Sequence, residues 1–212
     1  MRPGAAGERV FTADDFRRRA LRETGPFAVD EFGDHRLNPG LRDMIVRDGL
    51  RDAAVLVPVV DHGPEATVLL TQRNANLRSH SGQVAFPGGR IDAGDASAEA
   101  AALRETMEEI GLPGERVEVI GRLPDYVTGS GYRIAPVLSV VKPGFHLHLN
   151  PAEVDAAFEV PLSFLMDPAN HHRQSRTLNE VRRYFYEMPF GERYIWGVTA
   201  GIIRTLYERL YA

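Results

Sequence analysis

Apolar residues gather in short runs separated by turn residues, and these runs predict several strands. Residues 53–60 (AAVLVPVV) and 66–73 (ATVLLTQR) are rich in valine and leucine, which is typical of buried strands, and the turn-like DHGPE joins them. The segment QVAF at residues 83–86 predicts a third, short strand that the following PGG ends. Further strands are predicted at 116–123, 132–141 and 145–149.

Three other segments predict helices. TADDFRRRALRE, residues 12–23, begins at Thr12 with Asp15 in capping-box register. AEAAALRETMEEI follows Ser97, a favourable N-cap, and precedes Gly111, a favourable C′ residue. Near the end of the chain, the hairpin pattern RRYFYEMPFGERYIWG precedes a final helix at about 198–211. Strands, a central helix, more strands and a closing helix indicate an α+β, sandwich-like protein.

The length and composition fit one main domain with an extension. We expect a helical N-terminal extension over residues 1–50 and the main domain over residues 51–212, because 43% hydrophobic residues can supply a proper core. The chain has no cysteine, which excludes disulfides, thiolate metal sites and a cysteine nucleophile and fits a reducing compartment. No apolar run approaches the length of a membrane span, so we expect a cytoplasmic protein that does not enter membranes.

The net charge of −4 argues against general nucleic-acid binding, although all but one of the 25 basic residues are arginines. Arginine also suits phosphate recognition, and composition alone does not separate that use from a general bias. Monomer and homodimer both stay open.

The stretch LRETMEEIGL, residues 103–112, concentrates charge in the central helix. Glu105 and Glu109 are one helical turn apart and Glu108 lies beside them, so three carboxylates share one narrow face and repel one another. A solvated acidic face is the ordinary explanation. The alternative is a site for a hard divalent cation, because Mg²⁺ and Mn²⁺ prefer oxygen ligands.

The residues around these glutamates favour the metal site. GGRIDAGDASAEAAALRETMEEIGL, residues 88–112, resembles the Nudix box: Gly, five residues, Glu, seven residues, then Arg-Glu-apolar-any-Glu-Glu-any-Gly-apolar. Two positions depart from it, since Asp95 replaces the first glutamate with eight residues before the arginine, and Thr106 occupies the apolar position. The matching residues are Gly89, Arg104, Glu105, Glu108, Glu109, Gly111 and Leu112.

Membership of the Nudix superfamily implies a fold and a chemistry. The implied fold is an α/β/α sandwich with a mixed central sheet and a loop–helix–loop catalytic motif. The implied reaction is cleavage of a diphosphate joined to another group, in which Mg²⁺ or Mn²⁺ neutralises phosphoryl charge. Glu105 and Glu109 would be the principal metal ligands, with Glu108 contributing directly or through water. Arg104 would orient these carboxylates, and the carbonyl of Gly89 would approach the metal.

A second resemblance lies immediately upstream. LLTQRNANLRSHSGQVAFPGG, residues 69–89, resembles the additional signature of Nudix coenzyme A pyrophosphatases, with Asn74 where serine or alanine is expected. It implies hydrolysis of coenzyme A or its thioesters to 3′,5′-ADP and 4′-phosphopantetheine or its acyl form. The residues that would bind this substrate are Arg73, Arg78, Gly82, Phe86, Gly88 and Gly89.

Alternatives remain open at each level. The substrate could instead be another nucleoside diphosphate such as ADP-ribose, NADH or a dinucleoside polyphosphate. A non-catalytic ligand sensor would be expected to lose glutamates that this chain keeps. Arg73 and Arg78 are the natural partners for the substrate phosphates, but Arg73 could equally brace the fold by pairing with a core carboxylate.

Carboxylates and histidines outside the box are further candidates. Nudix enzymes often supply another carboxylate from a distant loop, and Glu153 in NPAEV is our candidate for an extra ligand or general base, with Glu159 as its competitor. His80 is more simply an incidental loop residue. His146 and His148 alternate on one predicted strand, but no third metal ligand stands at a recognisable spacing.

Overall fold

The computed structural model describes residues 10–22, 32–41, 49–77, 80–178 and 180–212. No helix in these ranges is both long and apolar enough to cross a bilayer. The helices are α1 (Ala13–Arg22), α3 (Ala98–Ile110), α4 (Leu162–Leu165) and α5 (Gly197–Leu210). The strands are β1 (Phe32–Gly33), β2 (Arg51–Val60), β3 (Thr67–Arg73), β4 (Val84–Ala85), β5 (Gly88–Arg90), β6 (Val117–Arg122), β7 (Tyr126–Val127), β8 (Tyr132–Val141), β9 (Val154–Pro161), β10 (His172–Leu178), β11 (Val181–Phe190) and β12 (Arg193–Trp196).

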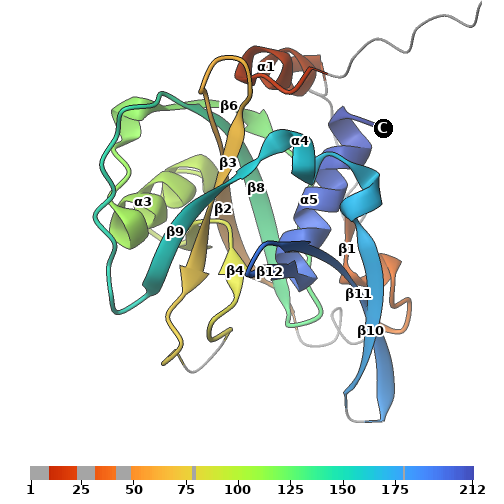
Figure 1. Ribbon diagram of the computed structural model, residues 1–212. Coiled ribbons are helices and arrows are strands. Elements are labelled where there is room, and N and C mark those ends of the chain that lie inside the picture. Colours follow the sequence, from red (N-terminus) through yellow and green to blue (C-terminus); the bar gives the residue numbers. More distant parts are fainter. Residues whose placement is uncertain (1–9, 23–31, 42–48, 78–79, 179) are drawn as a thin grey trace, which may run out of the picture.

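Within the described residues, nine strands form one mixed sheet at the centre of the molecule (Figure 1). β2 and β8 run parallel along their full length, from Arg51 opposite Tyr132 to Val60 opposite Val141. β3 lies antiparallel to β2, and β9 lies antiparallel to β3. The short strand β5 pairs with β2 and brings the PGG segment to the sheet.

Helices cover both faces of this sheet, as Figure 1 shows for α3 and α5. Alternate side chains of β2 point to opposite sides. Leu56 and Val60 join the apolar cluster beneath α3, whereas Val57 and Val59 join the larger cluster beneath α1 and α5. The expected α+β fold with a mixed sheet between helical layers is therefore confirmed.

The ends of the helices agree with the sequence. Thr12 precedes α1 and its Oγ1 accepts a hydrogen bond from the Asp15 N–H at 3.2 Å. Ser97 caps α3, and Gly111 follows it with a left-handed φ of 66°. The closing hairpin and helix are also present, as β11, β12 and α5.

Other predictions of elements were wrong or incomplete. Residues 145–149 form no strand; the Asn150 N–H and the His148 N–H bond instead to the carbonyls of Glu109 and Ile110 at 2.9 Å, so this segment closes the C-terminal end of α3. Phe145 and Leu147 alternate with polar residues as in a strand, but they pack on the core from an irregular backbone. The acidic segment after residue 150 contains β9, which the sequence analysis did not assign.

The described parts of residues 1–50 pack on the same body. Phe16 of α1 is fully buried in the cluster beneath α5, and Arg17 forms a salt bridge of 2.7 Å with Glu118 of β6. β1 pairs in parallel with β7 and so joins the central sheet. A division of the chain near residue 50 stays a prediction.

A second, three-stranded sheet consists of β10, β11 and β12 in that order. β11 packs against α5, while β10 is an edge strand within the described residues, and the β10–β11 hairpin projects beyond the main body (Figure 1). The strand β10 escaped sequence analysis because HRQSRTL is almost wholly exposed and lacks apolar alternation.

Candidate active site

The acidic helix α3 is fixed to the sheet by its alanine-rich side. Ala98, Ala101, Ala102 and Ile110 are buried against the apolar cluster of β2 and β8. Thr106, the departure from the apolar position of the box, is also buried and donates from Oγ1 to the carbonyl of Ala102 at 2.6 Å. Threonine can therefore replace an apolar residue because the helix itself satisfies its hydroxyl.

Glu109 is the most deeply buried of the three box carboxylates, with 3% of its side chain exposed. Its Oε2 accepts a hydrogen bond from the Gly88 N–H at 3.1 Å, and its Oε1 lies 3.6 Å from Nη1 of Arg73. Burial raises the pKa of Glu109 to about 7, against the opposing effects of Gly88 and Arg73; the charges of Glu153 and Glu105 raise it further. A cation placed here would favour the charged carboxylate.

Glu105 lies against the backbone of β5. A Cβ atom on Gly89 would stand only 2.4 Å from Oε2 of Glu105, so the absence of a side chain at residue 89 makes room for this carboxylate. Burial also raises the pKa of Glu105, Arg104 lowers it, and the charges of Glu108 and Glu153 raise it again.

Arg104 holds the acidic group together from the solvent side. Its Nη1 bonds to Glu105 at 2.8 Å and to Glu108 at 3.1 Å, and its Nε and Nη2 form a fork with Asp95 at 3.0 and 2.9 Å. The hydrogen bond from Arg104 lowers the pKa of Asp95. Asp95 is therefore the partner of Arg104 in the loop, and the orienting role of Arg104 stays a prediction.

Glu153 lies close enough to Glu105 and Glu109 for its charge to act on both carboxylates. Its charge raises the pKa of both Glu105 and Glu109, and Nδ2 of Asn150 donates to its Oε1 at 3.1 Å. Sequence analysis missed Asn150, although it stands three residues before Glu153 in the same motif. Glu159 lies elsewhere, paired with His62 at 2.6 Å and hydrogen-bonded to Thr67.

These acidic residues are of the kind that a divalent cation prefers. Glu109 is buried, Glu105 occupies the space that Gly89 leaves, and the charges of Glu105 and Glu153 both act on Glu109. Among the described residues, no three acidic or histidine side chains already converge as a ligand set, since Arg104 holds Glu105 and Glu108. Arg104 bonds to Oε1 of Glu105 and to Oε2 of Glu108, so a metal would have to meet the other oxygen of each carboxylate.

A cavity of about 280 Å³ opens beside this acidic group, and we call it the proximal cavity. Arg73, Gly88 and Gly89 are among the residues that line it, as are Trp196 and Val198. Phe86 contributes to its wall although only 4% of the residue is exposed, so it is mainly a core residue.

Arg73 lines this cavity and lies next to Glu109. It ends β3, its Nη1 faces Glu109, and its buried Nε has no hydrogen-bond partner among the described residues. Both the bracing role and a role in phosphate binding are compatible with this contact. Gly82 adopts a left-handed φ of 66° in the adjoining turn, and its carbonyl accepts from Gln72 at 2.8 Å. Arg78 lies outside the described residues.

Among the described residues, none of the three candidate histidines forms a metal-binding group with the acidic residues. His146 and His148 are exposed, in the segment that passes the end of α3. His80 lines the proximal cavity and its Nδ1 lies 3.0 Å from Oε1 of Gln83.

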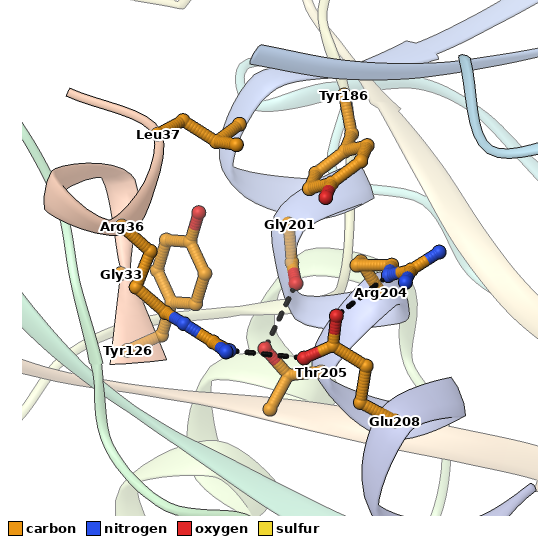
Figure 2. A pocket seen from close by; sticks show the side chains of 9 residues that line it. All are labelled: Gly33, Arg36, Leu37, Tyr126, Tyr186, Gly201, Arg204, Thr205 and Glu208. Atoms are coloured by element: carbon orange, nitrogen blue, oxygen red, sulfur yellow. Dashed lines mark hydrogen bonds and ion pairs between the residues drawn. The ribbon is translucent and has the colours of Figure 1, made fainter. Parts of the chain in front are cut away.

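A smaller cavity of about 180 Å³ lies between α5 and residues 33–37 (Figure 2). Glu208 pairs there with Arg36 at 2.9 Å and with Arg204 at 2.7 Å. No predicted site residue is among the described residues that line this cavity.

The chain is similar to known proteins over most of its length. The NUDIX domain model matches residues 50–184. A relative from Photorhabdus laumondii, "Uncharacterized Nudix hydrolase NudL", is 45% identical over 165 residues, covering 77% of this chain and 87% of that protein. The Escherichia coli K12 protein of the same name is 44% identical over 172 residues, covering 78% and 87%.

A solved structure is also similar to this chain. The NUDIX domain of Shewanella oneidensis NrtR, crystallised with ADP-ribose, is 19% identical, with a TM-score of 0.49 over 76% of this chain and 89% of that chain.

Proposed function

The chain belongs to the Nudix family and is a Nudix hydrolase, and from this premise we propose that it hydrolyses the diphosphate of coenzyme A or of a coenzyme A thioester. The products would be 3′,5′-ADP and 4′-phosphopantetheine or its acyl form. The observation that carries the proposal is the LLTQR…FPGG segment, residues 69–89, which resembles the coenzyme A pyrophosphatase signature. Its residues Arg73, Phe86 and Gly89 are among those that line the proximal cavity beside the acidic helix.

We assign the residues the roles that the resemblance to the Nudix box implies. Glu105 and Glu109 would hold Mg²⁺ or Mn²⁺ with the Gly89 carbonyl, and Glu108 would contribute directly or through water. A bound divalent ion neutralises charge on the phosphoryl oxygens and orients the attacking water. Arg104 would position the carboxylates through the fork to Asp95.

Two further residues, Arg73 and Glu153, would act on the substrate and on the attacking water. Arg73 would bind an oxygen of the scissile diphosphate, because its guanidinium stands beside Glu109 and opens on the cavity. Glu153, held by Asn150, would accept the proton of the attacking water.

A substrate panel tests the proposal. We expect kcat/KM for coenzyme A or an acyl-coenzyme A to exceed the values for ADP-ribose, NADH and diadenosine polyphosphates, with activity lost in EDTA. Much faster turnover of ADP-ribose than of any coenzyme A compound would show that the substrate assignment is wrong while leaving the family assignment intact.

A further inference from the structure

Residues 150–153, which we call the Glu153 loop, carry Glu153 to the acidic group. At the start of this loop, the Asn150 N–H donates to the carbonyl of Glu109 at 2.9 Å, and Nδ2 of Asn150 donates to Oε1 of Glu153 at 3.1 Å. The loop ends at Val154, the first residue of β9, which is 2% exposed and belongs to the same apolar cluster as the buried side of α3. Both ends of the Glu153 loop are therefore fixed to the part of the molecule that carries the box carboxylates.

Asn74, the residue that follows β3, binds the backbone of the Glu153 loop twice. Its N–H donates to the Glu153 carbonyl at 2.8 Å, and its Nδ2 donates to the Pro151 carbonyl at 2.6 Å. Its Oδ1 accepts from the Asn76 N–H at 2.7 Å. Because one end of the amide group meets an N–H and the other meets a carbonyl, these partners fix the orientation of the side chain.

The residues on either side of Asn74 are also joined to β9. Arg73 pairs with this strand beyond a bulge, in which Asp155 is the extra residue between the partners of Gln72 and Arg73. Oδ2 of Asp155 accepts from the Ala75 N–H at 3.0 Å. The end of β3 and the start of β9 therefore form one hydrogen-bonded unit, with Asn74 at its centre.

This unit joins two candidate parts of the site. Arg73 lies 3.6 Å from Glu109, and the charge of Glu153 acts on the same carboxylate. Asn74 is also the position at which this chain departs from the coenzyme A pyrophosphatase signature, where serine or alanine is expected. Alanine has no side-chain donor, and the hydroxyl of serine stands one bond closer to the backbone. Asparagine thus extends a donor to the Pro151 carbonyl.

We propose that Asn74 is a positioning residue that holds Glu153 beside the acidic group through the Pro151 carbonyl. The inference rests on the proposed function, because it takes Glu153 as the acceptor of the proton from the attacking water. Asn74 is not among the described residues that line the proximal cavity, so it acts through the loop and not on the substrate. Without its side-chain contact, the loop keeps fewer restraints on the place of the Glu153 carboxylate.

The first test replaces Asn74 by alanine and by aspartate. In Asn74→Ala, kcat should fall about 10- to 100-fold, since a shift of about 1 Å in a reacting group costs on the order of 10²-fold. KM should stay close to the wild-type value, because no substrate contact is removed. Asn74→Asp keeps an acceptor for the Asn76 N–H but has no donor for the Pro151 carbonyl, so it should lose at least as much kcat.

Asn76→Ala is the matched control. Asn76 is an exposed asparagine two residues further along, and it meets Asn74 only through its backbone N–H, which alanine keeps. This variant should retain the wild-type kcat. Wild-type kcat in Asn74→Ala and Asn74→Asp as well would overturn the proposal.

A double-mutant cycle separates positioning of Glu153 from a general effect on the fold. If Asn74 acts through Glu153, adding Asn74→Ala to Glu153→Gln should deepen the loss of kcat by less than about 2-fold. Losses that multiply would contradict the proposal. A raised KM with unchanged kcat would contradict it too, because the effect would then pass through Arg73 and the binding of substrate.

Hydrogen exchange gives a measurement that does not depend on turnover. The N–H groups of Ala152, Glu153 and Val154 all bond to Asn150. In metal-free Asn74→Ala, these groups should exchange faster than in the wild type and in Asn76→Ala, while α3 keeps its protection. Unchanged exchange in the Glu153 loop would show that the Asn74 side chain does not restrain it.

The same variants separate this inference from the proposed function. If the wild type cleaves ADP-ribose and not coenzyme A, and Asn74→Ala lowers kcat for ADP-ribose, the proposed substrate is wrong and the positioning role stands. If the wild type cleaves coenzyme A and Glu153→Gln is impaired while Asn74→Ala is not, the positioning role is wrong and the proposed function stands.

Discussion

Gly88 and Gly89 are neighbours in the chain, but the structure predicts opposite consequences for replacing them with alanine. A Cβ on Gly88 would lie 2.3 Å from the carbonyl oxygen of Ala54 and 2.6 Å from Cα of Val55, both backbone atoms, and its φ is 147°. A Cβ on Gly89 would instead meet the carboxylate of Glu105 at 2.4 to 2.8 Å, which is the movable end of a side chain.

The two substitutions should therefore change the free energy of unfolding by different amounts. Gly88→Ala combines backbone strain of about 1–3 kcal/mol with a displaced strand costing a similar amount, so unfolding free energy should fall by at least about 2 kcal/mol. For a domain of this size that lowers Tm by at least about 4 °C. Gly89→Ala should keep Tm within about 3 °C, because a strand tolerates alanine well and Glu105 can turn away.

Gly89→Ala, the variant expected to keep its stability, should lose activity. Moving the Glu105 carboxylate by about 1 Å costs on the order of 10²-fold, so Gly89→Ala should lose at least that much kcat/KM at limiting Mg²⁺. The assays are thermal unfolding in EDTA and steady-state hydrolysis across a Mg²⁺ titration. Gly94→Ala is the control, since a Cβ there has no neighbour within 4 Å. A fully active Gly89→Ala, or an unchanged Tm for Gly88→Ala, would refute this reasoning.

Three other outcomes are expected. Glu109→Gln should reduce kcat by several orders of magnitude while metal-free Tm is kept or raised, because a repulsive buried charge is removed; near-normal activity at saturating Mg²⁺ would contradict its role. Glu153→Gln should lower kcat about 10²- to 10⁴-fold at every Mn²⁺ concentration if Glu153 is the base, whereas a deficit that shrinks with added Mn²⁺ would make it a ligand. Burial raises the pKa of Asp34, so the folded protein holds the Asp34 proton more tightly than the unfolded chain does. Protonated Asp34 therefore stabilises the fold fully below the unfolded pKa of about 3.9. This stabilisation is lost as pH rises through the pKa of the folded state. Unfolding free energy measured against pH should show this loss in the wild type and not in Asp34→Asn, and identical slopes would contradict it.

The sequence predicted those parts of the structure whose local pattern and tertiary role agree. Both caps of α3 and the N-terminal cap of α1 are side-chain and glycine signals that act within a few residues, and all three are present. The strands β2, β3 and β8 are continuous apolar runs because helices cover both of their faces.

Features that depend on distant contacts were not predictable in this way. β10 is stabilised by backbone pairing with β11 and carries almost no buried side chain, so its sequence has no strand pattern. Residues 145–149 carry a strand pattern, yet the N–H groups of His148 and of the following Asn150 bond to carbonyls at the end of α3. The contact of Arg73 with Glu109 joins residues 36 positions apart and is visible only after folding.

Product analysis of coenzyme A hydrolysis is the most direct test of the central claim. The purified protein would be incubated with coenzyme A and Mn²⁺, with parallel reactions in EDTA and with Glu109→Gln, and the products identified by mass spectrometry. We predict 3′,5′-ADP and 4′-phosphopantetheine in equal amounts in the first reaction, and almost none in the other two. Intact coenzyme A in all three reactions, from a protein that cleaves ADP-ribose under the same conditions, would contradict the proposed function.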